Sequence, residues 1–270
     1  MSTLLLQLSD LHLFAEPDVL LREVPTRDSL GEVLEAVRGT GWEFDRVVVT
    51  GDFTHDERRE TYEVAQELLE EWLDRCHVLP GNHDDRGLLR EVFSGQAGGS
   101  DRGICFSQAV GGWRLIGIDT HVPGEVPGRV EQEMLDWLAG ELAEHVAEPT
   151  IVFQHHPPID VGSAWLDAIG LQDPGPYRDL ITSSPQVRVV SCGHVHQESS
   201  GTLGTAVVLT VPSTGVQFIP LCRTARVDAI APGFRVFALE DPADAVDASS
   251  VGWSTRVVRL PSVSFPAVDV

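Results

Sequence analysis

The sequence predicts an α/β fold, a four-layer α/β/β/α sandwich in which two β-sheets pack between helices. Three observations favour this fold. Short apolar runs alternate with amphipathic helical segments through the first two hundred residues. The second half of the chain is richer in strands than in helices. Pro80-Gly81 and Gly111-Gly112 mark turns between the segments.

The first half alternates strand and helix. Residues 4–8 form a short apolar run that suits a buried strand, and residues 47–49 are β-branched, as in a central strand. A helical pattern opens at residues 26–29, with apolar side chains following at spacings of three and four. Residues 57–73 form a charged amphipathic helix, and residues 77–79 form a strand that Pro80-Gly81 ends.

The second half begins with two strands, residues 104–110 and 113–118, joined at Gly111-Gly112 as in a hairpin. Residues 130–146 are expected to form a second amphipathic helix. The remaining expected strands are residues 151–153, 187–190, 203–209, 234–239 and 256–260. No internal repeat divides the chain, so we expect one domain over residues 1–270.

Composition excludes several functional classes. The chain carries 41 acidic against 19 basic residues, a net charge of −22, and every basic residue is arginine. This balance argues against nucleic acid and anionic membranes as partners, because both attract cationic proteins. No apolar run approaches a membrane span, and no basic residue precedes the apolar start, so no signal peptide is expected. Four widely spaced cysteines suggest reduced thiols and a cytoplasmic protein.

Side chains suited to metal binding fall in five small clusters, each directly after an expected strand. Ligands of α/β sheets bind at the carboxyl ends of the strands, so the clusters could converge on one crevice. Together and in this order they are a far stronger signal than any one of them. The clusters are Asp10-x-His12, Gly51-Asp52, Gly81-Asn82-His83-Asp84, His155-His156-Pro157 and Gly193-His194-x-His196.

These residue types suit two borderline divalent ions. Imidazole and carboxylate together favour Mn²⁺, Fe²⁺ or Zn²⁺ over Ca²⁺ or Mg²⁺, and the chain has no thiolate set for structural zinc. Asn82 is the only asparagine in the chain. It could be a turn residue after Pro80-Gly81, but its neighbours favour a neutral oxygen ligand.

The five clusters together resemble the calcineurin-like metallophosphoesterase superfamily, whose fold has two mixed sheets flanked by helices. A second set of stretches resembles the bacterial class III 3′,5′-cyclic-AMP phosphodiesterases. The resemblance spans a motif-bearing core of about residues 3–240, followed by a C-terminal strand and tail over residues 241–270. The second set comprises residues 162–167, 192–197, 211–214, 216–218 and 230–233.

The resemblance implies two metal sites that share one carboxylate. Asp10, His12, Asp52 and His196 would hold the first ion. Asp52, Asn82, His155 and His194 would hold the second, and a mixed Fe/Mn pair is one possible occupancy. The resemblance places the ligand two residues before proline, so Pro157 selects His155 over His156.

The chemistry expected of such a centre is phosphodiester hydrolysis. Two divalent ions with Asp10, Asp52 and one bridging hydroxide keep a net positive charge, which attracts a phosphodiester monoanion. The hydroxide would attack phosphorus in line with the leaving oxygen. His83 is the candidate acid for that oxygen, and Asn82 would act beside it. Alternatively, His83 orients Asp10 or Asp52.

Two further residues stay ambiguous. Trp165 and Asp167 could be a core tryptophan and a capping carboxylate, or a wall that contacts a nucleoside.

The leading functional interpretation is hydrolysis of 3′,5′-cyclic AMP to 5′-AMP by a monomer or homodimer. The alternative is a phosphodiesterase of broader specificity, acting on glycerophosphodiesters, 2′,3′-cyclic nucleotides or other small diesters. A nuclease or protein phosphatase fits the charge of −22 less well. A metal-binding sensor without turnover would show a degenerate ligand set, whereas this set is complete.

Overall fold

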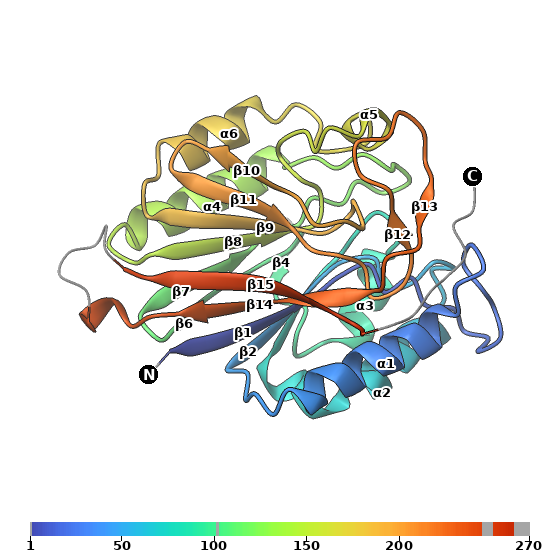
Figure 1. Ribbon diagram of the computed structural model, residues 1–270. Coiled ribbons are helices and arrows are strands. Elements are labelled where there is room, and N and C mark those ends of the chain that lie inside the picture. The colour runs from blue at the N-terminus through green and yellow to red at the C-terminus, as the bar shows by residue number, and fades with distance from the viewer. Residues whose placement is uncertain (1, 101–102, 245–250, 262–270) are drawn as a thin grey trace.

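Residues 2–100, 103–244 and 251–261 are described by the computed structural model. Two mixed sheets lie face to face, with helices on the outer face of each (Figure 1). The predicted α/β/β/α sandwich is therefore confirmed.

The first sheet has five strands in the order β15-β14-β1-β2-β3. The last three are parallel to one another, and the first two join antiparallel. The bounds are β1 (Thr3–Leu8), β2 (Arg46–Thr50), β3 (Cys76–Leu79), β14 (Gly233–Leu239) and β15 (Trp253–Arg259).

The second sheet has six strands in the order β10-β11-β9-β8-β7-β6, with parallel strands inside and an antiparallel strand at each edge. Its strands are β6 (Phe106–Val110), β7 (Trp113–Gly117), β8 (Thr150–Gln154), β9 (Val187–Cys192), β10 (Ser200–Leu203) and β11 (Ala206–Thr210). Two short pairs lie outside the sheets: β4 (Gly99–Ser100) with β5 (Gly103–Ile104), and β12 (Gln217–Phe218) with β13 (Val227–Asp228).

Helices cover the outer faces of both sheets. The helices α1 (Thr26–Gly39) and α2 (Arg59–Leu68) lie on the five-stranded sheet, and α4 (Gln132–Glu144) and α6 (Gly175–Thr182) on the six-stranded one (Figure 1). The helices α3 (Arg86–Val92) and α5 (Ala164–Asp167) are short. Among the described residues, no helix is long and apolar enough to cross a bilayer.

The core is divided by the alternation of side chains along the strands. In β8, Ile151 and Phe153 face the five-stranded sheet, and the Phe153 ring lies 6.1 Å from that of Phe237. Val152 points the other way and packs with Met134 and Ile181 of the covering helices. Because successive side chains of a strand point to opposite faces of the sheet, β8 contributes to both apolar layers of the core.

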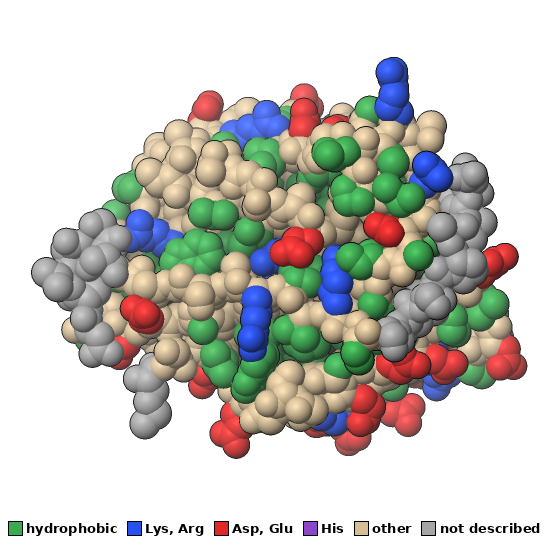
Figure 2. Space-filling view, in the orientation of Figure 1, with side chains coloured by type: hydrophobic (Ala, Val, Ile, Leu, Met, Phe, Trp, Pro, Cys, Tyr) green, Lys and Arg blue, Asp and Glu red, His purple; other side chains and the backbone are tan. Residues whose placement is uncertain are grey.

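Acidic side chains are concentrated on the exposed surface. On the face shown in Figure 2, aspartate and glutamate gather along the lower edge, where α1 and α2 lie. Several exposed arginines are neutralised there, as in the pairs of Arg38 with Glu71 and of Arg59 with Glu91.

The structure corrects two expected elements. The helix expected over residues 57–73 divides into α2 and a 3₁₀ helix over Glu70–Arg75. The last turn of α2 has no basic residue, and the acidic run that follows opposes the helix dipole. The strand expected over residues 203–209 is a hairpin of β10 and β11, because Gly204 turns the chain with φ of 60°.

Other differences are smaller. The helices α3 and α6 were not expected from the sequence. The strand expected over residues 104–110 begins at Phe106, and the C-terminal strand begins earlier, as β15. The tail over residues 262–270 lies outside the described residues.

Candidate metal centre

The predicted metal ligands follow five parallel strands at one edge of the sandwich. Asp10 and His12 follow β1, and Asp52 follows β2. The other ligand loops follow β3, β8 and β9, and they bring Asn82, His155, His194 and His196 to the same place. Since β8 and β9 belong to the second sheet, the centre lies where the two sheets meet.

The ligand loops have an unusual backbone. Five of the seven predicted ligands have positive φ: Asp10, His12, Asp52, His194 and His196, with values from 45° to 71°. Residues other than glycine rarely adopt this conformation, and such strain clusters at functional sites. The loops that follow β1 and β2 are also held to each other, because the backbone N–H of His12 donates to the Asp52 carbonyl at 2.8 Å.

Each glycine that precedes a ligand allows the loops to approach closely. A Cβ atom at Gly51 would lie 2.5 Å from the backbone nitrogen of Gly81. A Cβ atom at Gly81 would lie 2.1 Å from Oδ1 of Asp52, and one at Gly193 would lie 2.0 Å from the Ser9 hydroxyl. The loops could not pack as they do around any larger residue.

Four buried side chains form a first cluster. The Nε2 atoms of His12 and His196 lie 3.0 Å apart. The Nε2 atom of His12 is 3.4 Å from Oδ2 of Asp52, and that of His196 is 3.3 Å from Oδ1 of Asp10. All four ligand atoms lie within 4.8 Å of one another, so one ion could contact all of them.

A second cluster shares Asp52 with the first. The Nε2 atom of His155 lies 3.4 Å from Oδ2 of Asp52 and 3.2 Å from Oδ1 of Asn82. The Nδ1 atom of His194 lies 2.9 Å from the same amide oxygen. The carboxylate of Asp52 therefore stands between the two groups, as a bridging ligand would.

Backbone carbonyls fix the orientation of three imidazoles. Ring N–H groups donate from His155 Nδ1 to the Thr50 carbonyl at 2.7 Å, and from His196 Nδ1 to the Val216 carbonyl at 2.8 Å. The Nε2 atom of His194 likewise donates to the Ile169 carbonyl at 3.0 Å. Each bond holds the proton on the outer nitrogen, which leaves the inner nitrogen free to bind a cation.

His156 lies beside the second cluster, with its ring centroid 4.8 Å from that of His155 and 4.6 Å from that of His194, but its nitrogens have other partners. Its Nδ1 atom lies 2.8 Å from the Thr120 hydroxyl, and its Nε2 atom donates to the Val126 carbonyl at 3.0 Å. Both ring nitrogens thus have partners outside the cluster, whereas Nε2 of His155 points into it.

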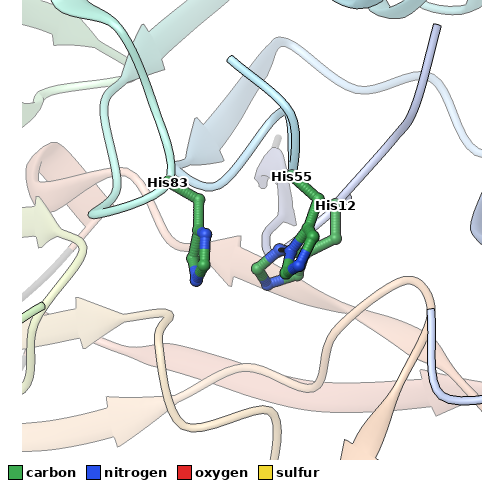
Figure 3. A group of neighbouring side chains, drawn as sticks. All are labelled: His12, His55 and His83. Atoms are coloured by element: carbon green, nitrogen blue, oxygen red, sulfur yellow. Dashed lines mark hydrogen bonds between the residues drawn. The ribbon is translucent and has the colours of Figure 1, made fainter.

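His83 contacts Asp52 through its backbone and His12 through its ring, whose centroid lies 5.0 Å from that of His12. Its N–H donates to Oδ1 of Asp52 at 2.8 Å, while its ring stacks on that of His55 with centroids 4.7 Å apart. Figure 3 shows the side chains of His12, His55 and His83 projecting to the same side. The Nδ1 atoms of His12 and His55 are 3.3 Å apart. The imidazole of His83 is therefore available to a ligand in front of the centre.

Burial and charge prepare the cluster for a cation. Burial alone would raise the pKa of the Asp52 carboxyl, but the charge of His155 holds it well below its ordinary value. Burial likewise opposes charge on His155, yet Asp52 raises the pKa of this imidazole to about 9. Burial keeps the pKa of His12 well below its ordinary value and lowers that of His194 to about 3. Both rings are therefore neutral and have lone pairs to offer.

A cavity of about 260 Å³ opens in front of the two clusters. One side is lined by ligands together with His55 and His83, and the other is largely apolar. Trp165 and Phe218 meet edge to face on that wall, with ring centroids 4.9 Å apart. Asp167 instead accepts the backbone N–H of Val161 at 2.7 Å, which is a structural contact.

Residues 3–198 match the family model described as calcineurin-like phosphoesterase. The chain belongs to the calcineurin-like phosphoesterase family. This phosphoesterase is 36% identical over 242 residues to the 3′,5′-cyclic adenosine monophosphate phosphodiesterase CpdA of Pseudomonas aeruginosa, covering 89% of this chain and 86% of the relative. It is 28% identical over 222 residues to the glycerophosphodiester phosphodiesterase GpdQ of Enterobacter lignolyticus, covering 81% and 80% of the two chains.

A solved structure shares the fold of the phosphoesterase. The dimetal phosphatase from Danio rerio superposes with a TM-score of 0.65, covering 88% of this chain and 94% of that chain. The identity is 17%, so this likeness concerns the architecture of the two sheets and their helices.

Three features of the site in this phosphoesterase were not predicted from the sequence: the orienting carbonyls, Arg22 and the place of Phe218. The orienting carbonyls carry no sequence signal, because every residue has a carbonyl. Arg22, which lines the cavity, stands between two acidic segments far from any motif. Phe218 lies in one of the stretches that suggested the phosphodiesterase branch, but only the structure places it on the cavity wall.

Proposed function

We propose that this phosphoesterase hydrolyses 3′,5′-cyclic AMP to 5′-AMP with two divalent metal ions. The observation that carries the proposal is the shared carboxylate of Asp52, which lies 3.4 Å from Nε2 of both His12 and His155. The name of the Pseudomonas aeruginosa relative supports cyclic AMP as the substrate. The apolar wall of Trp165 and Phe218 gives the cavity room and chemistry for a nucleoside.

The donor set fits a pair of metal ions. Asp10, His12 and His196 would hold one ion, Asn82, His155 and His194 the other, and Asp52 both. These side chains are buried, apart from the half-buried Asn82, and their inner atoms converge on two places that a cation could occupy. Mixed imidazole and carboxylate donors suit Mn²⁺, Fe²⁺ or Zn²⁺, and a mixed Fe/Mn pair is compatible with two different ligand sets.

Bound metal ions would supply positive charge to the phosphoryl oxygens and activate a water molecule. The chain's own residues provide the remaining chemistry. The Asn82 amide faces the second cluster and helps to position the phosphate there. His83 donates a proton to the leaving O3′ atom, because its imidazole lines the cavity while its backbone alone contacts Asp52.

The contacts of His83 are compatible with the acid role. Its ring meets the His12 ring edge to face, with centroids 5.0 Å apart, and its bond to Asp52 comes from the peptide N–H, which any residue supplies. The stacking of His55 on His83 restricts the ring to the cavity side.

We further propose that the chain acts as one catalytic domain on a small-molecule diester. Neither sheet alone carries the ligand set, so both are needed for a complete centre. The net charge of −22 opposes binding of nucleic acid or an anionic membrane.

Product analysis tests the proposal. The purified protein is incubated with Mn²⁺ and 3′,5′-cyclic AMP, and the products are separated. We expect 5′-AMP, lost in Asn82→Ala and retained in Gln132→Ala, a matched loss of an amide on the exposed face of α4. Formation of 3′-AMP, or turnover of glycerophosphodiesters alone, would contradict cyclic AMP hydrolysis as proposed and favour a broader phosphodiesterase.

A further inference from the structure

A tight turn at the mouth of the cavity has a strained backbone. Leu21 and Val24 exchange two backbone hydrogen bonds, each 2.9 Å long, across the two residues between them. Those residues, Arg22 and Glu23, have φ of 50° and 67°. A two-residue turn of this kind favours Asn-Gly, because positive φ is sterically unfavourable for residues with larger side chains. The chain places a long charged side chain where glycine would be more stable.

The turn is fixed to the loop that orients a predicted metal ligand. Val24 is buried against Val216, and Leu21 packs on the same small cluster together with Phe218. The carbonyl of Val216 receives the ring N–H of His196. The position of Arg22 is therefore set relative to the metal centre by packing on both sides.

Arg22 brings a positive charge to the cavity. Its guanidinium carbon lies 5.9 Å from the centroid of the Phe218 ring, and the side chain is otherwise exposed. Within the described part of the chain, Arg22 is the only lysine or arginine that lines the cavity. Exposed arginines such as Arg38 and Arg58 pair with glutamates, whereas the group placed against Arg22 is an aromatic ring.

We propose that Arg22 binds the anionic phosphoryl group of the substrate at the cavity mouth, an inference that rests on the proposed function for the identity of that substrate. A guanidinium can donate two parallel hydrogen bonds to phosphoryl oxygens, and the guanidinium carbon of Arg22 lies over the Phe218 ring, 5.9 Å from its centroid. The need is electrostatic, since the chain carries a net charge of −22, whose repulsion of anions is confined by screening to a range of about 8 Å at physiological salt. The strained turn places one cation on the wall of the cavity that holds the predicted ligands.

This role affects binding more than chemistry. Arg22 contacts the charge that the ground state and the transition state share, so its loss raises KM and leaves kcat nearly unchanged. It also stabilises the product phosphate monoester, so its loss weakens product binding.

The test compares Arg22→Gly with Glu23→Gly. Both variants put glycine at a positive φ in the same turn, and only the first removes the guanidinium. We expect Arg22→Gly to raise KM about tenfold for 3′,5′-cyclic AMP and for ethyl 4-nitrophenyl phosphate, with kcat within about twofold. Glu23→Gly should not raise KM. Both should raise the unfolding temperature by about 2 °C, because glycine relieves the turn.

Further measurements separate this proposal from the proposed function. If the wild-type protein cleaves ethyl 4-nitrophenyl phosphate but not cyclic AMP, cyclic AMP is not the substrate. The comparison of KM between the wild type and Arg22→Gly can still be made with ethyl 4-nitrophenyl phosphate. Calorimetric binding of 5′-AMP to the Mn²⁺-loaded protein needs no turnover, and its Kd should rise about tenfold in Arg22→Gly. Arg22→Lys should restore part of the affinity.

Three results would overturn the proposal. The first is an unchanged KM and an unchanged Kd for 5′-AMP in Arg22→Gly. The second is a rise of KM for cyclic AMP alone, which would assign Arg22 to the nucleoside. The third is a rise of KM accompanied by a fall in unfolding temperature, which would make Arg22 a structural residue of the turn.

Discussion

The Nε2 atom of His155 lies 3.4 Å from Oδ2 of Asp52, and both side chains are buried. Without metal the two form an ion pair, since Asp52 raises the pKa of His155 to about 9 despite the opposing effect of burial. A cation at this place would compete with the proton of His155 for the same lone pair.

We therefore expect metal binding to release a proton from His155. Because its pKa lies near 9, the imidazole carries a proton at pH 7.5, and about one proton should leave per protein as metal binds. Calorimetric titration with Mn²⁺ in two buffers of different ionisation enthalpy measures this number. Release should decline as pH rises through 9, and equal release at pH 7.5 and pH 10 would contradict the assignment.

Replacement of the shared carboxylate should affect both metal ions. Asp52→Asn removes a charge that both clusters face, so we expect metal content to fall well below one ion per chain. The Asp10 carboxylate accepts the backbone N–H of His194 but is a predicted ligand of the first ion alone, so Asp10→Asn should retain about one ion. Elemental analysis after gel filtration gives the stoichiometry, and equal losses in both variants would contradict a bridging role of Asp52.

His83→Ala should reduce turnover without loss of metal. The backbone bond to Asp52 remains, so metal content should match the wild type, whereas cyclic AMP hydrolysis should fall roughly 10²–10⁴-fold. A diester with a 4-nitrophenolate leaving group needs no proton and should lose much less. Equal losses for the two substrates, or loss of metal, would favour an orienting role for His83 instead.

Gly81→Ala should disrupt the centre through a steric clash. The new Cβ atom would lie 2.1 Å from Oδ1 of Asp52, with Asp52 backbone atoms also close. We expect lower metal affinity and a destabilised fold, by about 1–3 kcal/mol. The matched control is Gly140→Ala in α4, where nothing lies within 4 Å; it should stabilise the helix by about 0.5–1 kcal/mol. Thermal unfolding of both variants checks this pair.

The fold was predictable from local patterns because strand and helix periods reflect which faces are buried. Residues 47–49 and 151–153 sit inside β2 and β8, and the two-sheet sandwich followed from their order. One error arose where an apolar run concealed a local turn signal. Residues 203–209 read as one strand, yet Gly204 turns the chain so that Leu203 pairs with Ala206.

The sequence by itself determined the residue types, their order along the chain and their place at strand ends, which is enough to indicate a dinuclear phosphoesterase. Only the tertiary structure decided which atoms meet. It turns Nε2 of His155 toward Asp52, pairs the two nitrogens of His156 with Thr120 and the Val126 carbonyl, and brings Arg22 against Phe218. The physical reason is that a strand end fixes where a residue lies, whereas the direction of its side chain depends on hydrogen bonds and packing from distant segments.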